Sequence, residues 1–130
     1  MRRLFPLLLG LLLAGCATTG PTTKTLTAQD NGQTIRVAVH ATLVVQLSSN
    51  PTTGYSWEPA GKTLPVLKLF RSSHAPAAGL AGMPGMSGTD TFRFEVVQPG
   101  QQRLQLNYVR PWEKGVPPAQ TVVYDIIAAP

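Results

Sequence analysis

The stretch FRFEVVQPGQQRLQLNY, residues 92–108, decides the fold class. Apolar residues occupy every second position on both sides of its central Gln-Pro-Gly, namely Phe92, Phe94, Val96, Leu104, Leu106 and Tyr108. Because successive side chains of a β-strand point to opposite faces, this period of two gives each segment one face for a core and one for solvent. Gln98-Pro99-Gly100 has the composition of a tight turn. The stretch therefore predicts two half-buried strands joined by a hairpin turn.

The same alternation recurs at residues 35–39, 43–47 and 121–127, and Asp30-Asn31-Gly32 predicts a second hairpin turn. No window has the 3.6-residue period of a helix, so we expect antiparallel strands without helical crossovers. About seven to eight short strands in a little over a hundred residues are typical of an immunoglobulin-like sandwich. The fold class is therefore an all-β, antiparallel β-sandwich, with a small closed barrel as the alternative.

The first sixteen residues, MRRLFPLLLGLLLAGC, have the pattern of a secretory leader. Its apolar run of about eleven residues is shorter than the roughly 20 needed to span a bilayer. Cys16 follows small residues at the expected cleavage position, which resembles a bacterial lipobox, although an ordinary signal peptide with an incidental cysteine is the alternative. We expect a lipoprotein signal peptide at 1–15, an acylated Cys16 with a flexible tether at 16–23, and one compact domain at 24–130.

This leader predicts a palmitate-bearing lipoprotein that is held at the cell envelope by its N-terminal lipid. Ala17 stands where an inner-membrane retention signal would have Asp, which favours the outer membrane. Cys16 is the only cysteine, so no disulfide is expected. The net charge of +5 would fall to +3 when Arg2 and Arg3 leave with the leader, and no Lys/Arg run exists, which argues against nucleic-acid binding.

Catalytic and metal-binding patterns are missing from the sequence. The two histidines, His40 at an expected turn and His74 in an expected loop, are isolated and have no cysteine partner after acylation. No carboxylate pair and no Gly-x-Ser-x-Gly nucleophile motif is present. We therefore expect no enzyme, no metal and no cofactor, and a domain that is monomeric.

Three segments interrupt the alternation, at residues 50–54, 74–88 and 110–118. Loops of a sandwich often carry binding function because the strands hold them in place. The segments contain, in order, Asn-Pro-Thr-Thr-Gly-Tyr followed by Trp57, Gly-Met-Ser-Gly before a strand, and Arg-Pro-Trp. In this order and spacing they resemble the three signature loops of the chagasin family of inhibitors of papain-like cysteine proteases, over nearly the whole domain.

The resemblance implies an immunoglobulin-type fold whose three loops form a wedge that enters the protease active-site cleft. Inhibition would be reversible and non-covalent, with the first loop over the catalytic cysteine and histidine and Trp112 on the leaving-group side. The implied protease-binding residues are Asn50, Pro51, Thr52, Thr53, Gly54, Tyr55, Gly85, Met86, Ser87, Gly88, Arg110, Pro111 and Trp112. The family usually has Gly-x-Gly-Gly in the middle loop, and Ser87 stands at one of these glycine positions.

The residue types suit such a surface. Pro51 restricts the first loop in advance, and the hydroxyls of Thr52 and Thr53 are expected to reach a polar catalytic centre. Trp57 lies in an expected strand, on the face that alternation directs inward, so we expect it in the core. Trp112 lies among prolines and charged residues, so we expect it to be exposed. Arg110 either contacts the protease or holds its own loop by hydrogen bonds to carbonyls.

Two alternatives remain at this stage. Taken alone, residues 50–54 read as a simple turn in which Asn50 caps its own backbone. The alternative function is a non-inhibitory immunoglobulin-like lipoprotein with a structural or adhesion role at the envelope, because fold alone does not settle function.

Overall fold

The computed structural model describes residues 10, 15, 22–61, 64–77 and 87–130 of the 130-residue chain. Within these residues the elements are β1 (Thr23–Leu26), η1 (Ala28–Asp30), β2 (Thr34–Ala38), β3 (Thr42–Ser49), η2 (Pro51–Thr53), β4 (Ser56–Pro59), β5 (Leu67–Pro76), β6 (Gly88–Val96), β7 (Gly100–Val109) and β8 (Gln120–Ala129). The elements η1 and η2 are single 3₁₀ turns. None of the described helices is long and apolar enough to cross a membrane.

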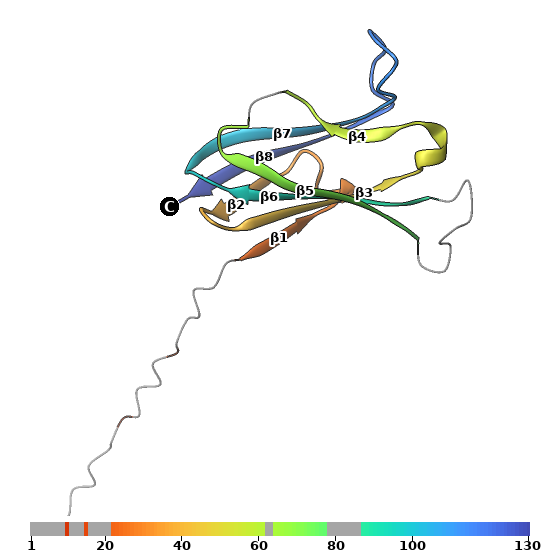
Figure 1. Cartoon of the computed structure of the whole chain (residues 1–130). Coiled ribbons are helices and arrows are strands. Elements are labelled where there is room, and N and C mark those ends of the chain that lie inside the picture. Colours follow the sequence, from red (N-terminus) through yellow and green to blue (C-terminus); the bar gives the residue numbers. More distant parts are fainter. Residues whose placement is uncertain (1–9, 11–14, 16–21, 62–63, 78–86) are drawn as a thin grey trace, which may run out of the picture.

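The strands form two four-stranded sheets that pack face to face (Figure 1). One sheet has the order β1-β3-β6-β5 and the other β2-β8-β7-β4. The side chains that alternation predicted to face inward are buried between them, and these include Leu43, Phe94, Leu104 and Ile126. The predicted all-β sandwich is therefore confirmed.

Strand direction follows from the connections, because the chain reverses direction between each strand and the next. Strands with an odd number therefore run one way and strands with an even number the other. Neighbours of unlike parity, such as β3 with β6 and β7 with β8, pair antiparallel. The β1–β3 and β2–β8 pairs have like parity and are parallel, so the expectation of antiparallel pairing throughout was wrong for these two pairs.

Both predicted hairpin turns connect strands of different sheets. Asp30-Asn31-Gly32 leads from β1 in one sheet to β2 in the other, and Gln98-Pro99-Gly100 leads from β6 to β7 in the same way. The turn residues were placed correctly, and Gly32 does have a positive φ of 82°. The hairpin interpretation was wrong because turn chemistry reverses the chain without specifying which sheet receives the next strand.

β5 was not predicted as a strand, and His74, placed in a loop by the sequence, lies within it. β5 pairs with β6 out to Pro76 and Gly88. A register shift between Leu69 and Arg71 breaks the alternation that would have revealed the strand. The loop that begins after β5 therefore starts later than expected, at residue 77.

The three loops that follow β3, β5 and β7 leave the sandwich at the same end, because odd-numbered strands all run toward it (Figure 1). β1 begins at the other end, where Thr23 pairs with Thr42, the first residue of β3. β8 also ends there, since its last residues pair with the start of β7. The fold thus brings three segments far apart in the sequence to one end of the molecule.

Candidate functional site

The first loop, residues 50–54, is a single 3₁₀ turn fixed by its own side chains. Asn50 caps the turn, since its Oδ1 accepts from the Thr52 N–H at 3.2 Å. The Gly54 N–H donates to the Pro51 carbonyl at 3.0 Å, and Gly54 adopts a left-handed φ of 82°. The Asn50 N–H donates to the Tyr108 hydroxyl at 3.0 Å, which ties the loop to β7. The capping turn read from the sequence is therefore present, and it builds a rigid loop.

The hydroxyl groups of the two threonines serve this loop. Thr52 Oγ1 donates to Asn50 Oδ1 at 2.6 Å, and Thr53 Oγ1 donates to the Asn50 carbonyl at 2.7 Å. Both hydroxyl protons are thus committed inside the loop. The expected contact of these hydroxyls with a catalytic centre stays a prediction, in which their oxygens would act as acceptors because their protons are bound to Asn50.

The third loop, residues 110–119, is tied to the first loop through Arg110. Arg110 Nε donates to the Thr53 carbonyl at 3.1 Å, and its guanidinium carbon lies 4.4 Å from the centre of the Tyr55 ring. Its Nη1 pairs with Glu113 Oε1 at 3.0 Å, and this hydrogen bond raises the pKa of Arg110 above its ordinary value. Of the two roles considered for Arg110, the structure shows the loop-holding one.

An aromatic stack continues from Arg110 into the core. The Tyr55 and Tyr108 rings have centroids 5.2 Å apart, and Tyr108 and Trp57 have centroids 4.9 Å apart. Trp57 is 5% exposed, and its Nε1 donates to the Ser48 carbonyl at 3.0 Å. The prediction that Trp57 is a core residue is confirmed, and its stack supports the first and third loops from below.

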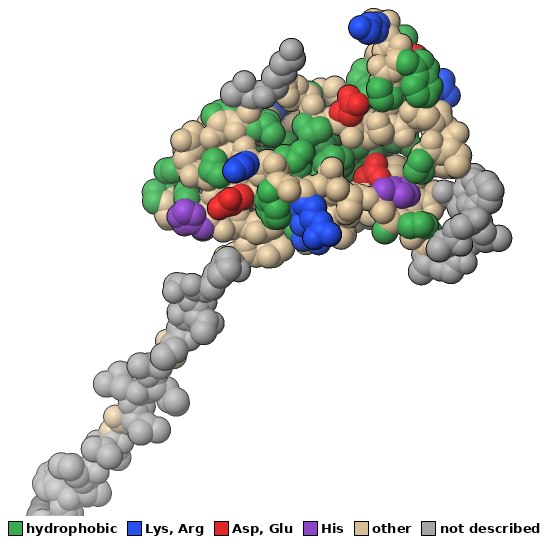
Figure 2. All heavy atoms as spheres, viewed as in Figure 1, with side chains coloured by type: hydrophobic (Ala, Val, Ile, Leu, Met, Phe, Trp, Pro, Cys, Tyr) green, Lys and Arg blue, Asp and Glu red, His purple; other side chains and the backbone are tan. Residues whose placement is uncertain are grey.

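Trp112 is 67% exposed, as the sequence predicted, and its indole lies against Gly54. A Cβ at residue 54 would overlap the Trp112 ring, with Cζ2 only 2.9 Å away. Val116, on the same loop, is 53% exposed. Figure 2 shows hydrophobic side chains gathered on the β7–β8 loop at the upper right of the molecule. An exposed tryptophan therefore stands on the backbone of the first loop.

The middle loop joins β5 to β6, and the predicted residues Gly85 and Met86 lie outside the described residues. Ser87 is exposed, and its carbonyl accepts from the Ala77 N–H at 3.2 Å. Gly88 is buried, and a Cβ there would overlap the Ala75 carbonyl and lie 2.8 Å from His74 Cε1. The Ala77–Ser87 hydrogen bond thus joins the two ends of the middle loop, and Gly88 beside it leaves no room for a side chain.

A polar cluster that sequence reasoning missed lies beside this base. His74 Nδ1 is 2.6 Å from Asp90 Oδ1 and 3.3 Å from Ser49 Oγ. In a hydrolase triad, serine and aspartate contact opposite ring nitrogens, whereas here both contact Nδ1. The cluster is therefore not a catalytic triad. Only strand pairing brings these residues together, so no local sequence signal could have revealed them.

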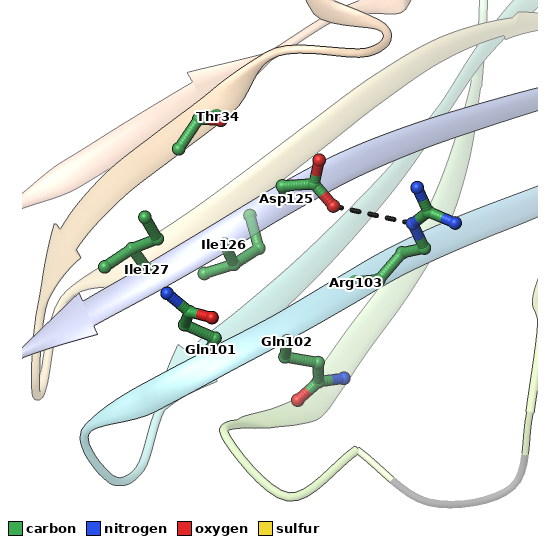
Figure 3. A pocket seen from close by; sticks show the side chains of 7 residues that line it. All are labelled: Thr34, Gln101, Gln102, Arg103, Asp125, Ile126 and Ile127. Carbon is green, nitrogen blue, oxygen red and sulfur yellow. Dashed lines mark hydrogen bonds and ion pairs between the residues drawn. The ribbon is translucent and has the colours of Figure 1, made fainter.

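One hollow lies away from the three loops. It is shallow, has a volume of about 410 Å³ and lies over β2, β7 and β8, and Figure 3 shows Arg103 pairing with Asp125 there. The Arg103 Nε and Asp125 Oδ1 atoms are 3.5 Å apart. The hollow faces the start of β7, whereas the third loop follows the end of that strand. Across the described ranges, no group of three or more His, Cys, Asp and Glu gathers as a metal would require.

Known proteins resemble most of the chain. Residues 36–126 match the family model described as Chagasin family peptidase inhibitor I42. Chagasin of Trypanosoma cruzi is 35% identical over 89 residues, which cover 67% of this chain and 81% of that protein. Amoebiasin-2 of Entamoeba histolytica is 26% identical over 112 residues, or 86% of this chain and 90% of that protein.

A solved structure shares the fold. The crystal structure of the cysteine protease inhibitor EhICP2 from Entamoeba histolytica superposes with a TM-score of 0.75 at 26% identity. The match covers 85% of this chain and all of that one. Sequence and structure thus identify the same group of relatives.

Proposed function

The chain belongs to the chagasin family of peptidase inhibitors, and we propose that its three loops enter and block the active-site cleft of a papain-like cysteine protease. The block is reversible and non-covalent. The first loop covers the catalytic cysteine and histidine, the middle loop pairs backbone groups with the cleft, and Trp112 packs on the leaving-group side. Contact by each of the residues named from the sequence is part of this proposal.

One observation carries the proposal: Trp112 is 67% exposed and yet held in place over Gly54. An indole this exposed gains little from folding, because the apolar area that it removes from water is small. Tryptophan and arginine are the residues most enriched at interface hot spots. A held, exposed tryptophan next to a rigid loop is therefore best explained by a partner that covers it.

The construction of the loops supports inhibition rather than cleavage. Binding costs less free energy when the contact surface is ordered in advance. The first loop has its turn capped, its two hydroxyl protons committed and its Thr53 carbonyl bound by Arg110. A loop held in this way does not relax into an extended substrate conformation, so it blocks the nucleophile without presenting a correctly placed peptide bond.

The test is a titration of papain with the chain from residue 22 onward, which contains all eight described strands and their core. Papain activity on a fluorogenic peptide is measured against inhibitor concentration, and the mixture is then diluted. We expect stoichiometric or near-stoichiometric loss of activity, recovery on dilution, and an uncut chain by mass spectrometry. Full activity at micromolar chain, against papain and several related cathepsins, would falsify the proposal.

The alternative role as a structural or adhesion module places no demand on the loops. It would need neither the exposure of Trp112 nor the tie from Arg110 to Thr53. No observation in the described part of the chain favours it specifically.

We further propose that Cys16 carries a lipid that anchors the domain to the outer membrane. Cys16 and the leader lie outside the described residues, so the support is the leader pattern together with the fold. β1 begins at the end opposite the three loops (Figure 1), so an N-terminal anchor leaves the loops facing away from its membrane. Residues 16–22 would allow the domain to stand at most roughly 25 Å from the lipid.

Acylation is tested by growing cells that express the chain with labelled palmitate. We expect label and membrane association in the wild type and neither in Cys16→Ser, with both forms inhibiting papain equally. Label in the Cys16→Ser chain, or none in the wild type, contradicts the anchor while leaving the inhibitory function standing.

A further inference from the structure

We propose that Ser49, His74 and Asp90, which we call the polar clamp, are positioning residues that hold the first and middle loops in their binding arrangement. The inference rests on the inhibitory function proposed above. None of the three residues lies in a loop, and none is expected to touch the protease. They act through the strand ends from which the two loops depart.

The donor and the acceptors in the polar clamp can be assigned from the chemistry of its side chains. A carboxylate only accepts hydrogen bonds, so the proton between His74 Nδ1 and Asp90 Oδ1, which are 2.6 Å apart, belongs to the histidine. Ser49 Oγ lies 3.3 Å from the same nitrogen. Ser49 is 4% exposed and is the one polar residue among the buried residues that the structure describes. Since the one N–H at Nδ1 already donates to Asp90, the Ser49 oxygen can only share it as a second acceptor, and removal of His74 would take this contact away.

The polar clamp spans three adjacent strands near the ends from which the loops depart. Ser49 pairs with Gly88, and Gly88 pairs in turn with Pro76. His74 and Asp90 pair two positions further from the loop, on β5 and β6. Ser49 is followed directly by Asn50, the cap of the first loop. A displacement of the His74 ring would therefore move Ser49, which directly precedes the first loop. It would also move the ends of β5 and β6, which flank the middle loop.

The clamp lies near the end of an edge strand. β5 is the edge strand of its sheet, and its pairing with β6 ends just beyond Pro76, where the Ala77 N–H donates to the Ser87 carbonyl. Ends of edge strands open more readily than strand centres. The side-chain pair from His74 to Asp90 connects the strands just inside this point. The clamp thus adds a side-chain tie between β5 and β6 close to the end of an edge strand.

The shape of the site fits the same role. A Cβ at residue 88 would lie 2.9 Å from His74 Nε2, so the imidazole covers Gly88 directly. The ring forms one wall of a hollow of about 300 Å³ between the sheets, lined also by Trp57, Ser72 and Phe92. Trp57 belongs to the aromatic stack under the first loop. The imidazole therefore connects the base of the middle loop with the support of the first.

Four substitutions test the clamp in the chain from residue 22 onward. His74→Ala removes the donor, and His74→Asn keeps an N–H close to the position of Nδ1. Asp90→Asn removes the charge and keeps an acceptor, in case the alanine variant fails to fold. Ser72→Ala is the matched control, because Ser72 lies on the same strand and lines the same hollow but takes no part in the hydrogen bonds of the clamp.

The first readout is the inhibition constant for papain. We expect it to rise about tenfold in His74→Ala and severalfold in Asp90→Asn, as for loss or weakening of a hydrogen bond to a charged group. His74→Asn and Ser72→Ala should stay within about threefold and twofold of the wild type, since one keeps the donor and the other leaves the clamp intact. Equal inhibition by the wild type and His74→Ala overturns the proposal. Equal weakening by His74→Asn and His74→Ala also overturns it, because the hydrogen bond would then have no role.

The second readout needs no protease and separates the clamp from the proposed function. Amide hydrogen exchange is measured at Thr53 and Gly54, whose N–H groups donate to the Asn50 and Pro51 carbonyls. Faster exchange in His74→Ala than in Ser72→Ala supports the clamp. If the wild type inhibits no protease, the proposed function fails and exchange alone decides, with equal rates in both variants overturning the clamp.

Discussion

The indole of Trp112 lies against the backbone of Gly54, so closely that a Cβ at residue 54 would come within 2.9 Å of Cζ2 and overlap the ring. The two residues are far apart in the sequence and belong to the third and first loops. Their contact means that the two loops form a single surface. The same surface is tied a second time, by the hydrogen bond of 3.1 Å from Arg110 to the Thr53 carbonyl.

Gly54→Ala is expected to weaken inhibition beyond its effect on stability. The left-handed φ of 82° costs a residue with a Cβ about 1–2 kcal/mol, and the Cβ also displaces Trp112. Gly61→Ala is the control, because Gly61 has a φ of 86° and nothing within 4 Å of its Cβ position. Denaturant unfolding should show similar losses for both variants, while the papain inhibition constant should rise only for Gly54→Ala. Equal inhibition constants would show that the contact with Trp112 has no role in binding.

Arg110→Gln is expected to raise the inhibition constant severalfold. It removes the charge over the Tyr55 ring and the pairing with Glu113, and it weakens the tie to Thr53. Arg103→Gln is the control, because the Arg103–Asp125 pair of 3.5 Å is exposed and distant from the loops. Association and dissociation rates should be measured for both by surface plasmon resonance on immobilised papain. Wild-type rates for Arg110→Gln would exclude a role for this tie.

Trp57→Ala is expected to destabilise the domain by about 3–5 kcal/mol, because it leaves a large cavity in the core. The substitution also removes the stack on Tyr108 and the hydrogen bond to the Ser48 carbonyl. Trp57→Phe keeps a ring and should lose less free energy of unfolding than Trp57→Ala. Chemical denaturation followed by circular dichroism gives both values. A loss below about 1 kcal/mol for the alanine variant would contradict a core role for this residue.

Tyr124 is expected to make the stability of the folded protein fall at high pH. Burial, followed by the negative charge of Asp30, raises the pKa of Tyr124 from 10.0 to about 12. Its hydroxyl donates to the Thr27 carbonyl at 2.7 Å. Since the folded state holds this proton more tightly than the unfolded state, its contribution to stability is complete below pH 10 and is lost as the pH rises toward 12.

Ultraviolet absorbance of tyrosinate measures this titration in the folded chain. One of the three tyrosines should ionise near pH 12, and this late step should be missing in Tyr124→Phe. Unfolding free energy should fall less steeply above pH 10 in that variant. If the late step persists in Tyr124→Phe, another tyrosine is responsible and the assignment is wrong.

The strands that alternate cleanly could be predicted from the sequence, and so could the sandwich. Phe92, Phe94 and Val96 are all buried because one face of β6 packs against the other sheet. β5 escaped prediction because its register shifts between Leu69 and Arg71, which places Phe70 on the surface. The parallel pairs depend on which sheet each strand joins, and local alternation carries no such information.

The loop residues could be predicted as a surface, whereas the contacts that order them could not. The exposure of Trp112 follows from its polar and proline-rich neighbours. The destination of the Thr52 and Thr53 hydroxyls depends on the fold of the turn itself. The pairing of His74 with Asp90 depends on β5, the strand that the sequence did not reveal. Features that depend on neighbouring residues could thus be predicted, whereas contacts between residues far apart in the sequence required the structure.

The most direct test of the inhibitory wedge compares the wild type, Trp112→Ala and Val116→Ala in equilibrium inhibition of papain, with unfolding free energies measured in parallel. Trp112 and Val116 are both exposed on the third loop, at 67% and 53%, so neither substitution should lower stability by more than about 0.5 kcal/mol. We predict that the wild type inhibits and that Trp112→Ala weakens inhibition by about 30-fold or more, equivalent to about 2 kcal/mol. Val116→Ala should have a much smaller effect. Wild-type inhibition by Trp112→Ala would contradict the account.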